Sequence, residues 1–169
     1  TIPGGAKTYV RAILKKIDNR FHAQKPVQAI SRSSNFVTIK LSNNQTEEFD
    51  CVVVATHADE ALKLLSDPTG DEKRLLGPWR YSLNHAVLHT DESFMPRRKA
   101  AWASWNYTVE KSDDTSKKVT LTYHMNRLQN LKTEKQYFVT FTASREMPKE
   151  KIIREMDYTP PQYTFDSLQ

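Results

Sequence analysis

The chain has 169 residues, a formal net charge of +5 at pH 7 and a pI near 9.3. Its 25 lysines and arginines are interspersed with 20 acidic residues, so no basic patch typical of nucleic-acid binding stands out. No apolar run approaches the ~20 residues that a membrane-spanning helix needs. We therefore expect neither a nucleic-acid partner nor a transmembrane segment, and the length would allow one ordinary domain.

The termini and the single cysteine add two further expectations. The chain begins at Thr1 rather than at a methionine and ends at Gln169 without a closing element, as a central piece of a longer protein would. Cys51 cannot form an internal disulfide, and a reduced thiol inside an apolar run favours a cytoplasmic protein. Nothing in the composition indicates an oligomeric state.

The first third of the chain predicts one helix and a small meander of strands. Apolar residues recur with helical spacing from Tyr9 to Ile17, so we expect a helix over residues 8–21. Strand patterns follow over residues 25–31, 36–41 and 47–55. The breaks between them are rich in serine and asparagine, which favour turns.

The most informative segment is the apolar run over residues 51–55, which ends at Thr56 and His57. A run without alternation is typical of a strand buried on both faces, as in a mostly parallel sheet covered by helices. Ligands bind such sheets beyond the carboxyl ends of the strands, which is where Thr56 and His57 lie. A histidine there can instead cap or pack beside the next helix, which we expect over residues 58–65.

The second half has a different composition and predicts a separate subdomain. A short helix over residues 71–76 is ended by Gly77 and Pro78, after which Tyr, Trp, Val and Thr become frequent. The expected strands cover residues 81–89, 100–110, 118–123 and 137–143, with a polar hairpin over 111–117 and a helical turn over 126–131. We expect these strands to form an antiparallel sheet, and residues 149–157 to lead back towards the first half.

The histidines indicate no metal site. His85 and His89 are four residues apart, which on a strand places them about 13 Å apart along one face, too far to ligate one ion. On a helix they could share an ion, but the usual motif has a glutamate where this chain has Ala86. We therefore expect two half-exposed strand histidines and no metal.

Aromatic residues gather in the second half and could line a pocket. Alternation places Trp105 and Tyr107 on one face of their strand and Trp102 on the other, with Tyr123 and Tyr137 on neighbouring strands. One interpretation is a substrate pocket roofed by Trp105, Tyr107 and Tyr123. The other is plain aromatic packing between strands.

Several sequence blocks occur in a characteristic order. Gly4-Gly5 precedes a helix, Lys25-Pro26-Val27 opens the meander, and residues 49–59 read Phe-Asp-Cys-Val-Val-Val-Ala-Thr-His-Ala-Asp. More specific are Trp-Ala-Ser-Trp-Asn-Tyr over 102–107 and Met-Asn-Arg-Leu-Gln over 125–129. Together they resemble the flavin-containing amine oxidoreductases, the monoamine-oxidase-like branch of FAD enzymes, and within it an uncharacterised group of predicted NAD/FAD-binding proteins. The resemblance covers nearly the whole chain.

The resemblance implies a mixed α+β and α/β fold and a protein of two domains. Residues 1–76 would be a partial FAD/NAD(P)-binding domain, comprising the helix, the meander and the buried parallel strand. Residues 77–158 would be a substrate-binding domain with an antiparallel sheet, and 159–169 would start the return to the FAD domain. The dinucleotide glycine fingerprint expected in the family has no match in this stretch.

The resemblance also implies roles for individual residues. The backbone of Val27 would contact the adenine of FAD, Ala55 and Thr56 would lie near its adenosine-diphosphate portion, and His57 is a further candidate for contact with the cofactor. The complete protein would be an FAD-dependent oxidoreductase acting on a small or lipid-like organic substrate, whereas this stretch alone would bind FAD weakly and be inactive. The alternative is a non-catalytic α+β domain that binds a ligand or a partner.

Overall fold

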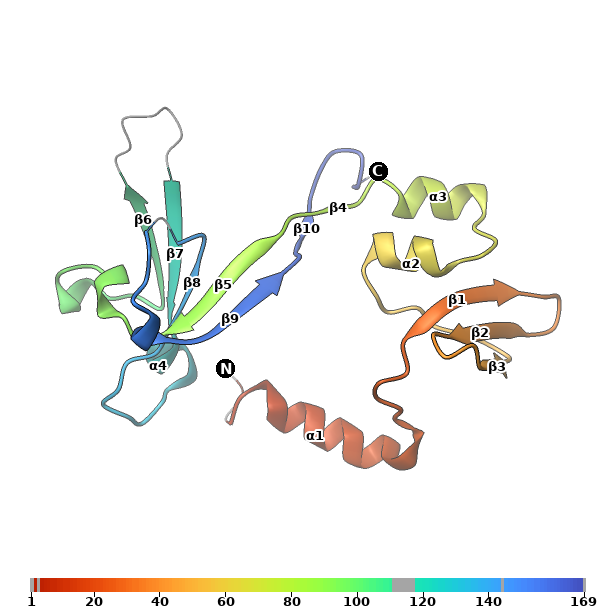
Figure 1. Cartoon of the computed structure of the whole chain (residues 1–169), viewed down its shortest axis with the longest axis horizontal. Helices are drawn as coiled ribbons and strands as arrows, with labels where there is room; N and C mark the ends of the chain where they lie inside the picture. The colour runs from red at the N-terminus through yellow and green to blue at the C-terminus, as the bar shows by residue number, and fades with distance from the viewer. Residues whose placement is uncertain (1, 3, 111–117, 144, 169) are drawn as a thin grey trace. The chain divides into compact units, whose positions relative to one another are not determined.

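The computed structural model describes residues 2, 4–110, 118–143 and 145–168 (Figure 1). The chain forms two compact units, one of residues 1–16 and 82–160 and the other of residues 17–81 and 161–169. All ladders between the named strands are antiparallel, so the mixed α+β fold is confirmed and the parallel sheet is not. The assignment of residues 1–76 and 77–158 to a cofactor domain and a substrate domain stays a prediction.

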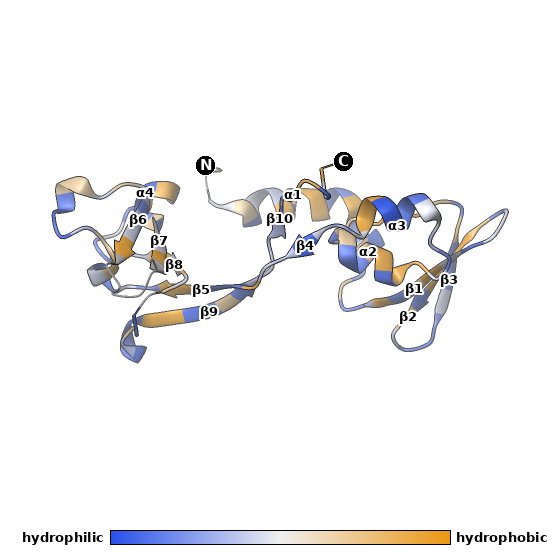
Figure 2. Ribbon diagram, turned by 90° about the horizontal axis from the view of Figure 1, so that it is seen from above, coloured by the Kyte–Doolittle hydropathy of each residue, from blue (hydrophilic) through white to orange (hydrophobic). Residues whose placement is uncertain are grey.

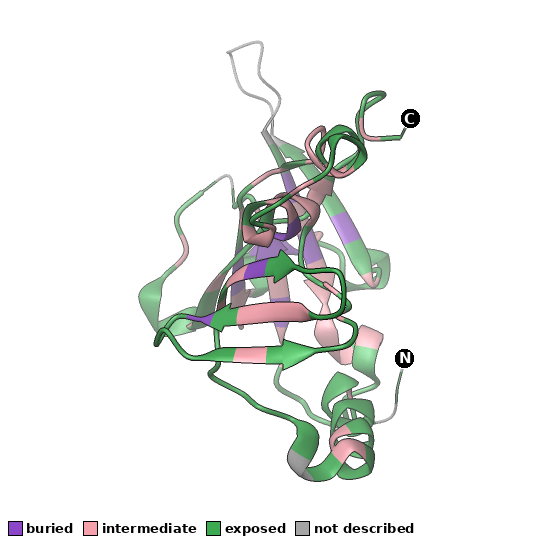
Figure 3. Cartoon of the chain, turned by 90° about the vertical axis from the view of Figure 1, so that its right-hand side faces the viewer, coloured by how far each residue is buried: buried purple, intermediate pink, exposed green. Residues whose placement is uncertain are grey.

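Helix α1 (Ala6–Ile17) confirms the helix expected near the start of the chain. It carries hydrophobic and hydrophilic residues along its length (Figure 2) and buries none of them (Figure 3). Tyr9, Val10 and Ile13 are each more than two-fifths exposed. None of the helices in the described part of the chain has the length and apolar character that crossing a membrane requires.

The meander of the second unit is a three-stranded antiparallel sheet in the order β1-β2-β3. Its strands are β1 (Val27–Arg32), β2 (Val37–Leu41) and β3 (Thr46–Phe49). Ile30 and Leu41 are buried, while the other residues of the sheet are half-buried or exposed (Figure 3). The first two expected strands are therefore confirmed, and the third is confirmed only in its polar first half.

Two short helices complete the second unit. They are α2 (Ala58–Leu64) and α3 (Gly70–Leu76), as expected. Ala61 of α2 is buried, and after this helix the N–H of Ser66 donates to the Ile30 carbonyl at 2.9 Å, which ties the helix end to β1. Helix α3 begins with a capping box, because the Thr69 hydroxyl accepts from the Glu72 N–H while the Glu72 carboxylate accepts from the Thr69 N–H.

Residues 51–55 do not form the buried central strand that the sequence predicts. They are extended, but no strand of the described chain pairs with them, and Val53 is 91% exposed. Only Val52 and Val54 are half-buried, and Cys51 is exposed. The prediction was wrong because a strand needs a neighbouring backbone for its N–H and C=O groups, and an apolar run does not reveal whether that neighbour is present.

Arg32, the last residue of β1, ties the helical segment to the sheet. Its Nη1 donates to Glu72 Oε1 at 2.7 Å, and its Nη2 donates to the Asp67 carbonyl at 2.7 Å. The hydrogen bonds from Arg32, followed by the bond from the Thr69 N–H, lower the pKa of Glu72 to about 2. One guanidinium therefore joins β1 to the loop before α3 and to its first turn.

The first unit is built on a five-stranded antiparallel sheet in the order β6-β7-β8-β5-β9. The strands are β5 (Asn84–His89), β6 (Trp105–Glu110), β7 (Lys118–His124), β8 (Phe138–Phe141) and β9 (Ile152–Tyr158). The first four were expected, although β6 begins at Trp105 rather than at residue 100. Strand β9 was not expected; it is the edge strand beside β5.

Short elements connect these strands. Helix α4 (Met125–Gln129) confirms the helical turn, and 3-10 turns occupy Glu92–Phe94, Lys99–Ala101 and Lys149–Lys151. The start of the strand expected over residues 81–89 is a separate short strand, β4 (Arg80–Tyr81), which pairs with β10 (Pro161–Gln162) in the second unit. The hairpin expected over 111–117 lies outside the described residues.

The two faces of the five-stranded sheet differ in chemistry. One, which we call the aromatic face, carries Trp105, Tyr107, Leu121, Tyr123 and Phe141. The other, which we call the threonine face, carries Asn106, Thr120, Thr122, Phe138 and Thr140, all buried. Phe94 and Trp102, from the segment between β5 and β6, pack on the rings of His89 and Phe138, so this face holds the core of the unit.

Candidate functional site

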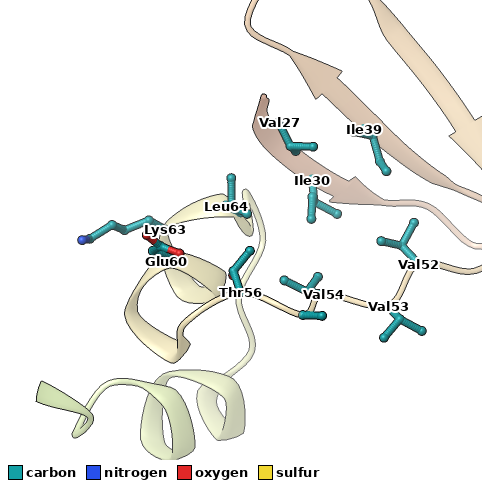
Figure 4. A pocket seen from close by; sticks show the side chains of 11 residues that line it. Val27, Ile30, Ile39, Val52, Val53, Val54, Thr56, Glu60, Lys63 and Leu64 are labelled. Atoms are coloured by element: carbon teal, nitrogen blue, oxygen red, sulfur yellow. The ribbon is translucent and has the colours of Figure 1, made fainter. Parts of the chain in front are cut away.

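The second unit contains a cavity of about 500 Å³ between its sheet, the extended segment after β3 and helix α2 (Figure 4). Ligand pockets in proteins typically have ~300–1,000 Å³ and mostly apolar walls. The lining residues are Val27, Ile30, Ile39, Val52, Val53, Val54, Ala55, Thr56, Glu60, Lys63 and Leu64. Residues from β1, β2, the extended segment and α2 therefore form one mostly apolar cavity.

Alternation along the extended segment explains why this cavity is apolar. Val52 and Val54 point towards Ile30 and the sheet, whereas Val53 points away from it (Figure 4). Strand β1 has a register shift just after Val27, and such bulges re-aim the neighbouring side chains. The resulting walls suit a flat apolar ring more than a charged group.

The polar groups lie on helix α2 and just before it. Lys63 pairs with Asp59 at 3.2 Å, and Glu60 and Thr56 supply a carboxylate and a hydroxyl. Burial on its own would raise the pKa of Asp59, but the hydrogen bond and the charge of Lys63 lower it below its usual value. Asp59 Oδ1 is buried and has no hydrogen-bond partner within the described residues.

Three of the four residues predicted to bind the cofactor line this cavity. They are Val27, Ala55 and Thr56, which come from β1 and from the end of the extended segment. His57 is not among the lining residues: its ring stacks on Tyr81 with centroids 4.4 Å apart and planes 10° from parallel. The Tyr81 hydroxyl accepts from the Ala58 N–H at 2.7 Å, so this pair secures the start of α2.

Sequence reasoning missed the contributions of β2 and α2 to the cavity. Glu60, Lys63 and Leu64 are three and four residues apart, so they share one helix face. That spacing was available in the sequence. The contribution of Ile39 was not, because it depends on how the meander pairs.

The predicted substrate residues gather on the aromatic face of the other unit. Trp105 and Tyr123 are cross-strand partners with ring centroids 5.5 Å apart, and Tyr123 continues to Phe141 at 5.4 Å. Trp105 is 60% exposed and Tyr107 68% exposed. Trp102 lies on the opposite side of the sheet against Phe138, as expected, although it precedes β6 and is placed there by the connecting segment. Cross-strand packing is therefore present, yet it leaves two large rings open to a ligand.

His89 corrects the expectation of two half-exposed histidines. It is fully buried, whereas His85 is exposed and bonds Asp157 at 2.8 Å. His89 Nδ1 accepts from the Asp91 N–H at 3.1 Å, so its Nε2 carries the hydrogen and donates to the Thr140 hydroxyl at 2.7 Å. Burial lowers the pKa of His89 to about 4, so the ring is neutral at pH 7. Within the described residues, no cluster of side chains could hold a metal ion.

Comparison with known proteins decides the family. The profile of the flavin containing amine oxidoreductases matches residues 1–158. The chain belongs to the flavin-containing amine oxidoreductase family. No curated protein matches it in sequence.

Among solved structures, this family member is similar in fold to the CLA-producing fatty acid isomerase from P. acnes. The two share 12% sequence identity with a TM-score of 0.56, over 90% of this chain and 39% of the isomerase chain. The chain thus spans well under half the length of that protein. At this identity the likeness concerns the fold alone.

Members of this family contain a flavin, so the cavity can be compared with the parts of FAD. The apolar walls formed by Val27, Ile30 and Val54 fit the adenine ring and its ribose. The pyrophosphate needs a glycine-rich turn at a helix N-terminus, and no glycine is among the described residues that line this cavity. The mostly apolar lining of this cavity is therefore compatible with the adenine of the cofactor.

Proposed function

We propose that this chain supplies the adenosine-side wall and the substrate-side sheet of an FAD-dependent oxidoreductase that acts on an apolar organic substrate. The family match over residues 1–158 is the observation that carries the redox assignment. When bound, FAD would accept or donate a hydride equivalent. The residues of this chain would bind the adenosine part of FAD, orient the substrate and shield both from water.

On the cofactor side, the proposal assigns Val27 and Thr56 to the adenosine part of FAD. Adenine can pair with the backbone N–H and C=O groups of a residue whatever its side chain, so a valine serves at position 27. Ala55 presents a small side chain where the chain has to approach the cofactor closely. His57 acts indirectly, because its ring holds Tyr81 and thereby the start of α2.

Filling the cavity tests this assignment. Ala55 is exposed towards the cavity, so Ala55→Phe should occupy the adenosine volume without disturbing a packed core. In the complete protein we expect a lower FAD content, with a melting temperature equal to that of the wild type when both are freed of FAD. Ala23→Phe places the same ring at an exposed alanine that does not line the cavity, and should leave FAD content unchanged. Equal FAD content in both variants would refute the assignment.

On the substrate side, the proposal assigns Trp105, Tyr107 and Tyr123 to the substrate pocket. Their rings form an apolar surface with two hydroxyl groups, which suits an apolar or lipid-like molecule better than a highly charged one. A tryptophan and a tyrosine this exposed contribute little to the core, so their loss should affect the substrate rather than the fold.

Conservative variants separate substrate contact from packing. Trp105→Phe and Tyr107→Phe should change KM or kcat of the complete protein while melting temperature and flavin content stay near the wild-type values. Tyr163→Phe, which removes a hydroxyl from an exposed ring outside this sheet, is the matched control and should change neither. Lower stability with unchanged kinetics would refute the substrate role.

The flavin itself tests the non-catalytic alternative. The complete protein should be purified with FAD bound, whereas the 169-residue chain alone should bind added FAD weakly, because its sequence contains no GxGxxG fingerprint for the pyrophosphate. A complete protein that takes up no FAD under any condition would favour the non-catalytic binding domain.

A further inference from the structure

A second cavity, of about 250 Å³, lies on the threonine face of the five-stranded sheet. It is thus on the side opposite Trp105 and Tyr107. Its walls come from the segment after β5, from β6 and β7, and from the chain after β8. The residues that matter here are Ser93, Phe94, Arg97, Thr108, Thr120 and Arg145.

Two arginines line this cavity, and none of the carboxylates that the structure describes does. Arg145 is held in place, because its guanidinium lies over the Phe94 ring at 4.4 Å and its Nη2 donates to the carbonyl and the hydroxyl of Ser93. Within the described residues only Nη2 of this guanidinium is hydrogen-bonded. The remaining N–H groups of a fixed fork are a preorganised donor set for a carboxylate or phosphate.

Two further donors at the cavity have no partner. The Arg97 side chain and the Thr108 hydroxyl make no hydrogen bond or ion pair to any residue that the structure describes. The Thr120 hydroxyl already donates to the Thr142 carbonyl at 3.2 Å. Thr120 therefore forms part of the cavity wall but is not counted as a donor to a ligand.

Neighbouring acids do not cancel this positive charge. Asp91 accepts from the Ser93 N–H at 2.9 Å and interacts with the charge of Arg145, so it offsets one arginine. Glu92 pairs with Lys99 at 3.2 Å and is thereby neutralised. Among the residues that the structure describes, the charge of Arg97 has no counterion.

We propose that this cavity binds a compact anionic oxygen group, a phosphate or a carboxylate. Arg97 and Arg145 would donate charge-assisted hydrogen bonds to it, and Thr108 would donate a third. The Phe94 ring is buried beneath Arg145 and therefore fixes the position of the guanidinium. This proposal stands whether or not the aromatic face binds substrate, because the two lie on opposite faces of the sheet.

Titration with simple anions tests the site. The purified protein is titrated in a calorimeter with inorganic phosphate and, separately, with acetate, while sodium chloride keeps the ionic strength constant. We expect saturable binding of at least one of the two anions. Arg97→Gln removes a charge-assisted bond and should weaken that binding about tenfold or more. Thr108→Val keeps the shape, removes only the hydroxyl, and should weaken it by a smaller factor.

Arg98→Gln is the matched control. Arg98 is the exposed neighbour of Arg97 and does not line the cavity. The Arg98→Gln variant should therefore bind the anions as tightly as the wild type does. Tighter phosphate binding would identify a phosphate ligand, and tighter acetate binding a carboxylate; either supports the proposal. No saturable binding of either anion, or equal weakening by Arg97→Gln and Arg98→Gln, would overturn it.

Discussion

Lowering the pH should destabilise the first unit through His89. The ring is fully buried in the neutral form, with Nδ1 accepting from the Asp91 N–H and Nε2 donating to Thr140. The Thr140 hydroxyl in turn lies 2.9 Å from that of Thr122. Protonating His89 would put a hydrogen on Nδ1, facing the Asp91 N–H, and would place a charge in the core.

The magnitude follows from proton linkage. Burial lowers the pKa of His89 from 6.5 to about 4, so at intermediate pH the unfolded chain binds a proton that the folded chain does not. The contribution of His89 to the free energy of unfolding is therefore fully present above pH 6.5 and is lost as the pH drops towards 4. Each unit of difference between the pKa of His89 in the folded and in the unfolded chain is worth ~1.4 kcal/mol. The loss in free energy of unfolding is therefore about 2 kcal/mol at pH 5 and reaches about 3.4 kcal/mol below pH 4.

Urea unfolding at a series of pH values measures this loss. Between pH 8 and pH 5, the wild type should lose about 2 kcal/mol more than His89→Gln, which cannot ionise. His85→Gln removes the exposed histidine of the same strand and should keep the wild-type pH dependence. If His89→Gln and the wild type lose the same free energy over this range, His89 is not held neutral by burial and the reasoning fails.

Three further predictions concern stability. Val53→Asp should change the free energy of unfolding by less than ~0.5 kcal/mol, because Val53 is 91% exposed, whereas Val54→Asp should cost more than ~1 kcal/mol; equal effects in urea unfolding would contradict the observed alternation. Thr142 has φ 52°, a left-handed conformation that asparagine tolerates better than threonine, so Thr142→Asn should gain ~0.5–1 kcal/mol, and an unchanged or lower melting temperature would argue against that strain. The lowered pKa of Glu72 contributes stability above pH 4.5 that is lost as the pH falls towards about 2; Glu72→Gln should therefore be less stable than wild type at pH 7 and equal to it near pH 2, and a difference that persists at pH 2 would indicate another cause.

Local pattern predicted most of the elements. The helical spacing from Tyr9 to Ile17 and the alternation in β2 depend only on neighbouring residues, and both elements are present. The alternation within β6 likewise placed Trp105 and Tyr107 on one face of the sheet. The cavity residues Val27, Ala55 and Thr56 also proved to lie together, but their grouping was inferred from resemblance to a family rather than from spacing.

The failures have a common physical cause. Residues 51–55 and β9 both depend on a partner strand distant in sequence: the apolar run lacks one in the described chain, and β9 finds one in β5. Likewise, Arg97 and Arg145 are 48 positions apart in the numbering and meet only because the sheet brings their segments to one cavity.

By itself, the sequence determined the positions of the helices and most strands, the two faces of β6 and the membership of a flavoenzyme family. Those features follow from side-chain periodicity and from specific blocks of residues. Tertiary structure alone decided that His89 is buried, that Val53 is exposed and that His57 stacks on Tyr81. The physical reason is that burial and backbone pairing depend on which distant segment lies alongside, and the same apolar or aromatic residue serves equally well in either setting.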